Sequence, residues 1–283
     1  MRRFEYFEPG TLGEAVALLA RYQGRAQPLA GGTDLLVEIK EQLRRADCVV
    51  NIKKIPGMAQ LAYDARAGLR IGALVTAREI ELSQFILKHY ISLAQAAREL
   101  GSIQVRNRAT IIGNVCRASP SADTLPPLIA DGAVAKIYGP GGERMVLLEG
   151  FFKGPGKTSL EPDELVTEIV VPPPPPRTGK VYIKHGRRKA MELATVGIAV
   201  SLTLDSDVRI VLGAVAPTPI RARRAEALLR GKTLNDDLIE KAAKAAEDES
   251  RPVSNVRASA EYRRDMVRVL TSRALHQALD LAT

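Results

Sequence analysis

GSIQVRNRATIIGNVCRASPSADTLPPLIAD, residues 101–131, is the stretch around which the chain is organised. Its middle, residues 109–123, has no regular period of apolar residues and is crowded with glycine and short polar side chains. Glycine and asparagine adopt backbone conformations that leave amide N–H groups open, and consecutive open amides bind anions without a lysine. A long polar loop before an apolar run is often functional. The pattern therefore indicates a binding loop, although by itself it is equally typical of an ordinary surface loop.

A second stretch, residues 29–40, reads LAGGTDLLVEIK. Its turn, residues 30–34, again combines small residues with a hydroxyl and a carboxylate, and a short apolar segment precedes it. Two such turns, far apart in the sequence, favour one phosphate-bearing ligand that both loops enclose.

These stretches contain the motifs AGGTDLLVEIK, QVRNRATIIGN and ASPSADTLPPL. Together they resemble the FAD-binding medium subunit of the molybdenum hydroxylases, the family of carbon monoxide dehydrogenase, xanthine dehydrogenase and aldehyde oxidoreductase. The resemblance continues through FFKGPGKTSLEPDELVTEIVVP, YIKHGRRKAMELATVGIAV, GAVAPTPIRARRAEALLRG and SNVRASAEYRRDMVRVL, and so covers essentially the whole chain. The combination is specific, whereas each glycine pair alone is a weak signal.

Composition agrees with a soluble globular protein. The 283 residues have room for two or three domains, and hydrophobic and charged contents of 46% and 26% are ordinary. There is no apolar run long enough for a membrane span, and MRRFEYFEPG lacks the apolar core of a signal peptide, so we expect a cytoplasmic location. The net charge of +9 comes with scattered arginines and only 4% aromatic residues, which favours protein partners or an anionic cofactor over nucleic acid.

The cysteines and histidines predict no metal site in this chain. Cys48 and Cys116 are far apart and form no CxxC pair, so thiols cannot build a cluster or a zinc site here. We interpret Cys48 as a buried strand residue and Cys116 as a small apolar residue in the loop. His89, His185 and His276 are isolated in sequence.

The apolar patterns predict an α+β fold in three units. Residues 1–57 form a small β-α-β unit, residues 58–176 a second α/β unit, and residues 177–283 an antiparallel sheet with helices. Five prolines, residues 172–176, make a stiff connector at the second boundary. The resembled family has a two-subdomain FAD-binding fold of the PCMH, or vanillyl-alcohol-oxidase-like, type, with FAD between the two N-terminal subdomains. Among the clearest predicted elements are a hairpin over residues 133–148, a strand over 165–171 and a helix over 236–249.

Two nucleotide-binding motifs are incomplete. GPGKT, residues 154–158, resembles a P-loop, but Phe151 occupies the position of the first required glycine and Pro155 removes an amide. We interpret it as a turn. No G-x-G-x-x-G fingerprint joins a strand to a helix.

The resemblance implies roles for both loops. Amides of residues 30–34 hold the pyrophosphate with a hydroxyl from Thr33, and residues 110–114 close over the phosphates and ribityl chain. Asp123 accepts from a ribose or ribityl hydroxyl. Lys184 matches a lysine near the flavin ring, where a cation favours reduced flavin; Tyr182 either covers one ring face or packs in the sheet core. The predicted cofactor-binding residues are Leu29, Ala30, Gly31, Gly32, Thr33, Asp34, Leu35, Leu36, Gly101, Thr110, Ile111, Ile112, Gly113, Asn114, Asp123, Val166, Tyr182 and Lys184.

One position departs from the family pattern, which is usually Thr-Ile-Gly-Gly-Asn. This chain has Ile112 in place of the first glycine. A branched side chain there is expected to hinder the approach of backbone to phosphate, so we expect Ile112→Gly to tighten FAD binding.

The resemblance implies an oxidoreductase subunit that carries FAD and transfers electrons, with no catalytic residue for the organic substrate. Molybdenum cofactor is expected on a large partner subunit and two-iron clusters on a small one, as a dimer of heterotrimers. The external acceptor is NAD, a quinone, oxygen or a protein. Two alternatives stay open: a flavin-free assembly or maturation factor with the same fold, and a stand-alone flavin oxidase.

Overall fold

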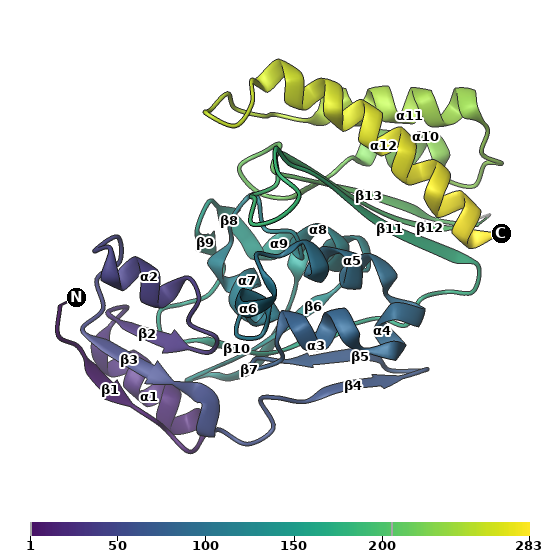
Figure 1. Ribbon diagram of the computed structural model, residues 1–283. Coiled ribbons are helices and arrows are strands. Elements are labelled where there is room, and N and C mark those ends of the chain that lie inside the picture. The colour runs from purple at the N-terminus through teal and green to yellow at the C-terminus, as the bar shows by residue number, and fades with distance from the viewer. Residues whose placement is uncertain (1, 205) are drawn as a thin grey trace.

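The structure, a computed structural model, describes residues 2–204 and 206–283. Figure 1 shows a small N-terminal lobe at the lower left, a larger central unit, and a C-terminal sheet above it with helices on its outer face. The α+β class predicted from the sequence is confirmed. In the part of the chain that is described, no helix is both long and apolar enough to cross a membrane.

The N-terminal lobe contains a three-stranded parallel sheet in the order β1-β3-β2. Helix α1 begins where the Thr11 hydroxyl accepts a hydrogen bond from the Glu14 amide at 3.2 Å, and it ends at Gln23, whose φ of 46° is left-handed. The elements are β1 (Glu5–Phe7), α1 (Leu12–Tyr22), β2 (Ala26–Leu29), α2 (Leu35–Lys40), β3 (Cys48–Asn51) and the 3₁₀ turn η1 (Ile52–Lys54).

The central unit contains a five-stranded antiparallel sheet in the order β4-β5-β10-β6-β7, with helices over one face. The predicted hairpin and central strand are present. The helices are α3 (Ala77–Leu82), α4 (Gln84–His89), α5 (Ile91–Glu99), α6 (Ile103–Arg106), α7 (Ile111–Arg117), α8 (Leu125–Ala130) and α9 (Leu148–Phe151). The strands are β4 (Leu61–Asp64), β5 (Gly68–Gly72), β6 (Val134–Gly139), β7 (Gly142–Leu147) and β10 (Leu165–Val171), with the separate hairpin β8 (Phe152–Gly154) and β9 (Lys157–Thr158) in place of a P-loop.

The prediction of an irregular loop over residues 109–123 is wrong in part, because α7 lies inside it. Thr110 caps this helix by accepting from the Gly113 amide at 3.1 Å. Ile111, Ile112 and Val115 form its buried stripe. The helix is short and contains glycine and asparagine, so its apolar spacing is hidden among residues typical of loops.

The first two units share one apolar core. Ala15, Val16 and Leu19 of α1 belong to the same cluster of buried side chains as Ile71 of β5 and Ile137 of β6. The turn at residues 56–57 therefore separates two sheets that remain packed against common side chains.

The C-terminal unit is an antiparallel sheet whose two faces differ in chemistry. Val181 and Ile183 of β11 pack toward the outer helices, whereas Lys180, Tyr182 and Lys184 face the central unit, as alternation along a strand requires. The elements are β11 (Thr178–His185), β12 (Val196–Thr203), β13 (Val208–Gly213), β14 (Ile220–Arg221), α10 (Arg223–Leu229), α11 (Asp236–Glu249) and α12 (Ala260–Ala282).

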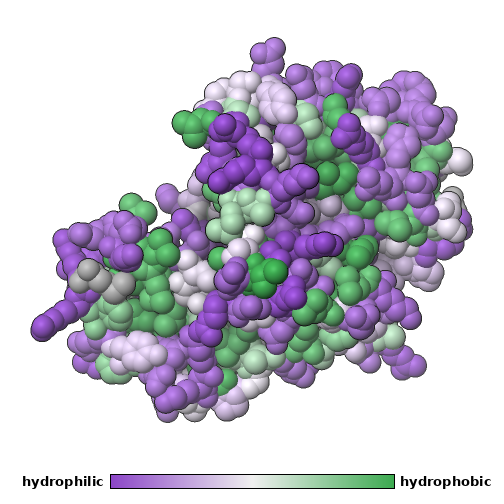
Figure 2. All heavy atoms as spheres, viewed as in Figure 1, coloured by the Kyte–Doolittle hydropathy of each residue, from purple (hydrophilic) through white to green (hydrophobic). Residues whose placement is uncertain are grey.

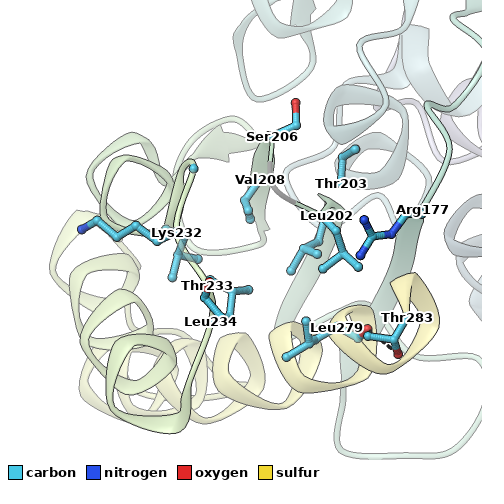
Figure 3. Close-up of a pocket in the computed structure, with 13 residues that line it drawn as sticks. Arg177, Leu202, Thr203, Ser206, Val208, Lys232, Thr233, Leu234, Leu279 and Thr283 are labelled. Atoms are coloured by element: carbon cyan, nitrogen blue, oxygen red, sulfur yellow. Dashed lines mark hydrogen bonds between the residues drawn. The ribbon is translucent and has the colours of Figure 1, made fainter.

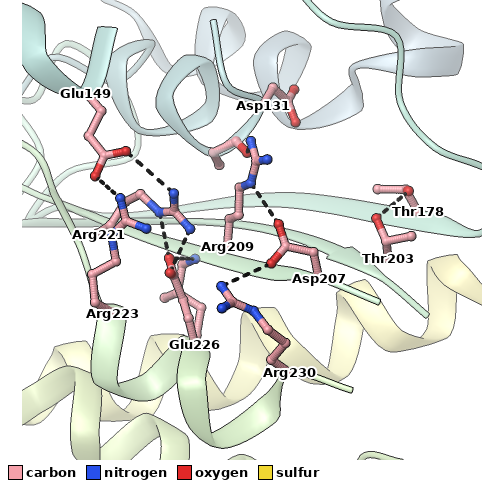
Figure 4. A network of polar contacts seen from close by, with 12 residues as sticks. Asp131, Glu149, Thr178, Thr203, Asp207, Arg209, Arg221, Arg223, Glu226 and Arg230 are labelled. Atoms are coloured by element: carbon pink, nitrogen blue, oxygen red, sulfur yellow. Dashed lines mark hydrogen bonds and ion pairs between the residues drawn. The ribbon is translucent and has the colours of Figure 1, made fainter. Parts of the chain in front are cut away.

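An ion-pair network also joins the C-terminal and central units (Figure 4). Arg221 donates to both carboxylate oxygens of Glu226, at 2.9 and 2.7 Å, while Glu149 of α9 pairs with Arg221 and Arg223. The first residue of the proline connector is anchored as well, since the Tyr90 hydroxyl donates to the Pro172 carbonyl at 3.0 Å. The contacts of Glu149 with Arg221 and Arg223 bridge the central and C-terminal units.

Candidate functional site

The two glycine-containing turns meet in space. A Cβ added to Gly31 would lie 2.0 Å from the Arg108 carbonyl oxygen, so only glycine allows this approach. Between the turns lies a cavity of about 200 Å³. Its lining combines both turns with residues that follow β3 and β5: Ala30, Gly31, Lys53, Leu74, Thr76, Asn107, Arg108 and Thr110.

The backbone amides of the two turns differ in availability. In the described chain, no protein acceptor is found for the amides of Gly31, Gly32, Thr33 and Asp34. In the second turn, by contrast, the Ile111 amide donates to the Val75 carbonyl at 3.1 Å, and the Gly113 and Asn114 amides bond to Thr110. The four amides of the first turn are therefore available to a ligand, whereas those of Ile111, Gly113 and Asn114 already have protein acceptors.

Lys53 and Arg108 bring positive charge to the same cavity, and the sequence analysis missed both. Burial and the charge of Arg108 lower the pKa of Lys53. Lys53 Nζ donates to Asn51 Oδ1 at 3.1 Å, a neutral partner, so an anion in the cavity would relieve the repulsion between the two cations. The sequence could have predicted Lys53, because it follows strand β3, which is parallel to β2. Ligands of parallel sheets bind beyond the carboxyl ends of the strands, where Lys53 lies.

An ion pair ties together the helices that follow the two turns. Glu38 of α2 pairs with Arg117 of α7 at 2.7 Å and with Arg44 at 2.7 Å. Because α2 and α7 begin beside the cavity, the Glu38–Arg117 pair links the segments that follow the two turns.

Asp123, Tyr182 and Lys184 form a second cluster across the boundary between the central and C-terminal units. The Tyr182 hydroxyl donates to Asp123 Oδ1 at 2.7 Å, and Lys184 Nζ donates to Asp123 Oδ2 at 2.9 Å. Lys184 Nζ also donates to the Glu99 carbonyl at 3.0 Å. Sequence reasoning assigned these three residues separately to one cofactor, and in the structure Tyr182 and Lys184 both contact Asp123.

Burial dominates the electrostatics of this cluster. Burial raises the pKa of Asp123 to about 6, against the opposing effects of the Lys184 charge and the hydrogen bonds from Lys184 and Tyr182. Burial also raises the pKa of the Tyr182 hydroxyl well above its usual value, which keeps it a donor. Of the two interpretations of Tyr182, the structure favours the core position, because the side chain is 6% exposed and packs in the large apolar cluster.

The remaining predicted residues support the loops in different ways. Leu29, Gly32 and Leu36 pack closely: a Cβ at Gly32 would lie 2.9 Å from Leu29 Cδ1 and 3.1 Å from Leu36 Cδ1. Asp34 precedes α2 without a capping hydrogen bond from its side chain, and Leu35 begins that helix. Thr33 is half-buried between them and the glycines.

Three predicted residues lie farther along the fold. Asn114 Oδ1 accepts from the Thr124 hydroxyl at 2.6 Å, which ties α7 to the start of α8. Gly101 has a left-handed φ of 52° at the end of α5. Val166 is buried in β10 and belongs to the apolar core.

The expectation for Ile112 is wrong about where its side chain lies. Ile112 is 4% exposed and belongs to the apolar core shared by the first two units. Its replacement by glycine would remove buried apolar contacts and add backbone freedom within α7, so tighter cofactor binding no longer follows. Cys116, on the same helix, packs against this core, and burial raises its pKa to about 12.

A second cavity, of about 220 Å³, lies at the opposite end of the C-terminal sheet (Figure 3). Leu202, Val208 and Leu279 line it together with Thr203. The register places Thr203 opposite Thr178, at the far end of β11 from Lys184. This cavity is therefore separate from the cavity between the two turns and from the Asp123–Tyr182–Lys184 cluster.

Comparison with known proteins shows the family of this chain. Residues 2–174 match the family described as "FAD binding domain in molybdopterin dehydrogenase". The chain belongs to this family. Residues 181–278 of the flavoprotein match a second family, "CO dehydrogenase flavoprotein C-terminal domain", so the first match ends within the proline connector and the second begins after it.

Characterised relatives extend along the whole flavoprotein. The chain is 33% identical to the xanthine dehydrogenase FAD-binding subunit of Escherichia coli O157:H7 over 98% of its length and 96% of the relative. It is 35% identical to the carbon monoxide dehydrogenase medium chain of Hydrogenophaga pseudoflava, over 98% and 97% of the two chains. A solved structure of carbon monoxide dehydrogenase from Hydrogenophaga pseudoflava, which lacks the Mo-pyranopterin moiety, superposes with a TM-score of 0.96 over 100% of this chain and 99% of the other. The recognition of an FAD subunit of this oxidoreductase family is confirmed.

Proposed function

We propose that this chain holds FAD between its two glycine turns and carries electrons within a molybdenum hydroxylase complex. The observation that supports the binding site best is the row of open amides at residues 31–34, which borders a cavity shared with Lys53, Arg108 and Thr110. Open amides beside two cations fit a diphosphate, which is the most highly charged part of FAD.

The other parts of the cofactor have matching groups. The cavity of about 200 Å³ is smaller than a complete ligand pocket, so it takes the diphosphate and leaves the sugar and ring to neighbouring surfaces. Each oxygen of Asp123 has a further lone pair beyond its contact with Tyr182 or Lys184, and these suit hydroxyl groups of the cofactor. Lys184 supplies positive charge at the flavin end. When bound, FAD supplies the one- and two-electron chemistry that no side chain can perform.

The proposal includes partners. The relatives are medium subunits of multi-chain enzymes, and two separated cysteines in this sequence cannot ligate an iron–sulfur cluster. We place the molybdenum cofactor on a large subunit and two-iron clusters on a small one, in a cytoplasmic dimer of heterotrimers. The external acceptor is NAD, a quinone, oxygen or a protein. The proposed protein has three units, residues 1–57, 58–176 and 177–283, of which the first two are the FAD-binding subdomains.

The alternative of a flavin-free assembly or maturation factor is no longer favoured by Ile112. That alternative depended on Ile112 obstructing the phosphate loop, and the side chain lies in the core instead. Gly31 lines the cavity, Gly32 packs against Leu29 and Leu36, and the Asp123 carboxylate accepts from Tyr182, which supports the flavin-binding proposal.

An absorbance spectrum tests the function directly. The purified chain should show flavin bands and should bleach with dithionite. Mixed with aldehydes, purines or carbon monoxide, it should stay oxidised until the partner subunits are added. A folded chain without flavin bands after incubation with FAD would contradict the proposal, and rapid bleaching by a substrate in protein free of molybdenum and iron would favour the stand-alone oxidase.

A further inference from the structure

One arginine of helix α12 is turned into the protein. Arg263 is 3% exposed, whereas Arg264, Arg268 and Arg273 of the same helix are exposed to solvent. Figure 2 shows mainly hydrophilic residues along the top of the molecule, where α11 and α12 lie in Figure 1. Burial and the nearby charge of Arg257 lower the pKa of Arg263, so the position of this charge is unfavourable in itself.

Arg263 also lacks the partner that other nearly buried arginines of this chain have. Arg106 pairs with Glu81 at 2.8 Å, and Arg221 pairs with Glu226 at 2.7 Å. In the part of the chain that the structure describes, no carboxylate forms an ion pair with Arg263. A buried charge without a counter-charge destabilises a fold unless its hydrogen bonds compensate. The groups that Arg263 contacts therefore indicate its role.

The guanidinium of Arg263 joins three backbone segments at one end of the C-terminal sheet. Its Nη1 donates to the carbonyls of Thr195 and Ala214, at 2.6 and 3.2 Å, and its Nη2 donates to Asn255 Oδ1 at 2.9 Å. Thr195 directly precedes β12, and Ala214 directly follows β13. The φ of Ala214 is 64°, a left-handed conformation that is strained for a residue with a side chain. The hydrogen bond from Arg263 holds the carbonyl of this strained residue.

The turn at residues 213–214 contacts the segment that carries Asp123, on both sides of that residue. The Ala214 amide donates to the Pro120 carbonyl at 2.8 Å. A Cβ added to Gly213 would lie 2.8 Å from Pro126 Cγ, so the backbone packs directly against this ring. Pro120 precedes Asp123 by three residues and Pro126 follows it by three. The turn therefore holds the segment before and after the carboxylate that Tyr182 and Lys184 contact.

We propose that Arg263 is a positioning residue for the flavin site, which fixes the place of the Asp123 carboxylate by holding the turn at residues 213–214. The effect on the cofactor rests on the proposed function, in which Asp123 accepts hydrogen bonds from FAD. Arg263 neither contacts Asp123 nor lines the cavity between the glycine turns. In Figure 1 its helix lies on the outer face of the C-terminal sheet and α8 lies on the inner face, so the influence passes around the end of the sheet.

The test compares variants that remove different contacts. Arg263→Lys keeps the charge, but a single ammonium cannot reproduce the fork that reaches both carbonyls and Asn255. Should this variant not fold, Arg263→Gln, which removes the buried charge and keeps an amide donor, takes its place. Asn255→Ala is a control that leaves both carbonyl contacts of Arg263 intact. Arg221→Lys is a control with the same substitution at another nearly buried arginine of this unit.

Hydrogen exchange of the chain without FAD measures the positioning directly. In Arg263→Lys, amide exchange in residues 117–126 and 213–216 should be about tenfold faster, the change expected for the loss of one hydrogen bond. Both controls should keep the exchange of the unaltered chain in these segments, even where urea denaturation shows that they are less stable. Unchanged exchange in the Arg263 variant overturns the proposal.

Titration with FAD tests whether Arg263 acts through Asp123. Arg263→Lys should bind FAD about tenfold more weakly than the unaltered chain, whereas the same change added to Asp123→Ala should cause almost no further loss. Losses that multiply in the double variant would show an effect independent of Asp123 and would overturn the proposal. If the unaltered chain itself does not bind FAD, the proposed function fails, while the exchange rates still decide whether Arg263 positions the segment.

Discussion

Two buried ion pairs, Asp123–Lys184 and Asp131–Lys180, show how the same chemistry serves two purposes in this fold. Both aspartates flank α8, and both lysines lie on one face of β11. Their burial is nearly equal, with side-chain exposures of 6% and 7% for Lys184 and Asp123, and of 5% and 3% for Lys180 and Asp131.

The surroundings of the two pairs differ. Lys180 lies over the Tyr90 ring, 4.5 Å from its centroid, next to the anchor of the proline connector. Asp123 instead receives the Tyr182 hydroxyl, and Lys184 shares its charge with the Glu99 carbonyl. The Asp131–Lys180 pair lies against an aromatic ring and joins two units of the fold. The Asp123–Lys184 pair has further hydrogen-bond partners, which a ligand hydroxyl could replace or join.

The largest expected effect is on stability and comes from the Asp131 pair. Asp131→Ala leaves the Lys180 charge buried without its partner, which should lower the free energy of unfolding by about 3–5 kcal/mol. FAD affinity of the folded protein should change little. Urea denaturation measures the loss, and adding Lys180→Met as a second change should restore much of it. Equal stability of Asp131→Ala and the unaltered chain would show that this pair does not hold the units together.

The matching change at the other pair should affect the cofactor most. Asp123→Ala removes a charged acceptor for cofactor hydroxyls, and such bonds contribute about 1.5–3 kcal/mol, so FAD affinity should fall roughly ten- to a hundredfold. Lys184 keeps the Glu99 carbonyl as acceptor, which limits the structural damage. Titration with FAD measures the change, and retention of FAD through dialysis at the level of the unaltered chain contradicts the assignment.

The Asp123–Lys184 pair should make the stability of the protein depend on pH, because the pKa of Asp123 is raised. Its folded pKa of about 6 lies above the usual value of 3.8, so the folded state holds a proton that the unfolded state has lost between these values. The contribution of this group to stability is therefore present at low pH and is lost as pH rises through 6. Relative to Asp123→Asn, the unaltered protein should lose stability from pH 4.5 to 6 by up to about 1.4 kcal/mol per pH unit. Denaturation curves of both proteins across this range measure the difference; parallel behaviour would contradict the raised pKa.

The smallest effect is expected at Tyr182. Tyr182→Phe removes one hydrogen bond to Asp123 and should cost about 1 kcal/mol of stability. Because this bond lowers the pKa of Asp123, its loss should move the Asp123 titration to higher pH. NMR titration of the carboxyl carbon provides the measurement, with Tyr138→Phe in β6 as a control. A shift to lower pH would mean that Tyr182 does not donate to the carboxylate.

The sequence alone determined the regular elements wherever local signals agree. Strand β10 and helix α11 have the predicted bounds, because β10 is a nearly continuous apolar run and Asn235 caps α11 ahead of a clear apolar stripe. The motifs and their order along the sequence were also enough to predict the family. Weak local signals failed: β1 alternates poorly, β4 is only partly buried, and α7 contains residues that favour turns.

Which side chains come together in the site depends on tertiary packing that the sequence does not show. Lys53 reaches the cavity because parallel strands bring the turn after β2 and the residues after β3 to one edge, and Arg108 reaches it because its backbone packs against Gly31. The side chain of Ile112 was placed by the packing of α7, which no motif comparison describes. Asp123, Tyr182 and Lys184 converge across the proline connector because β11 turns its polar face inward. Periodicity and capping act over a few residues and can be read along the chain, whereas these contacts depend on how distant surfaces pack.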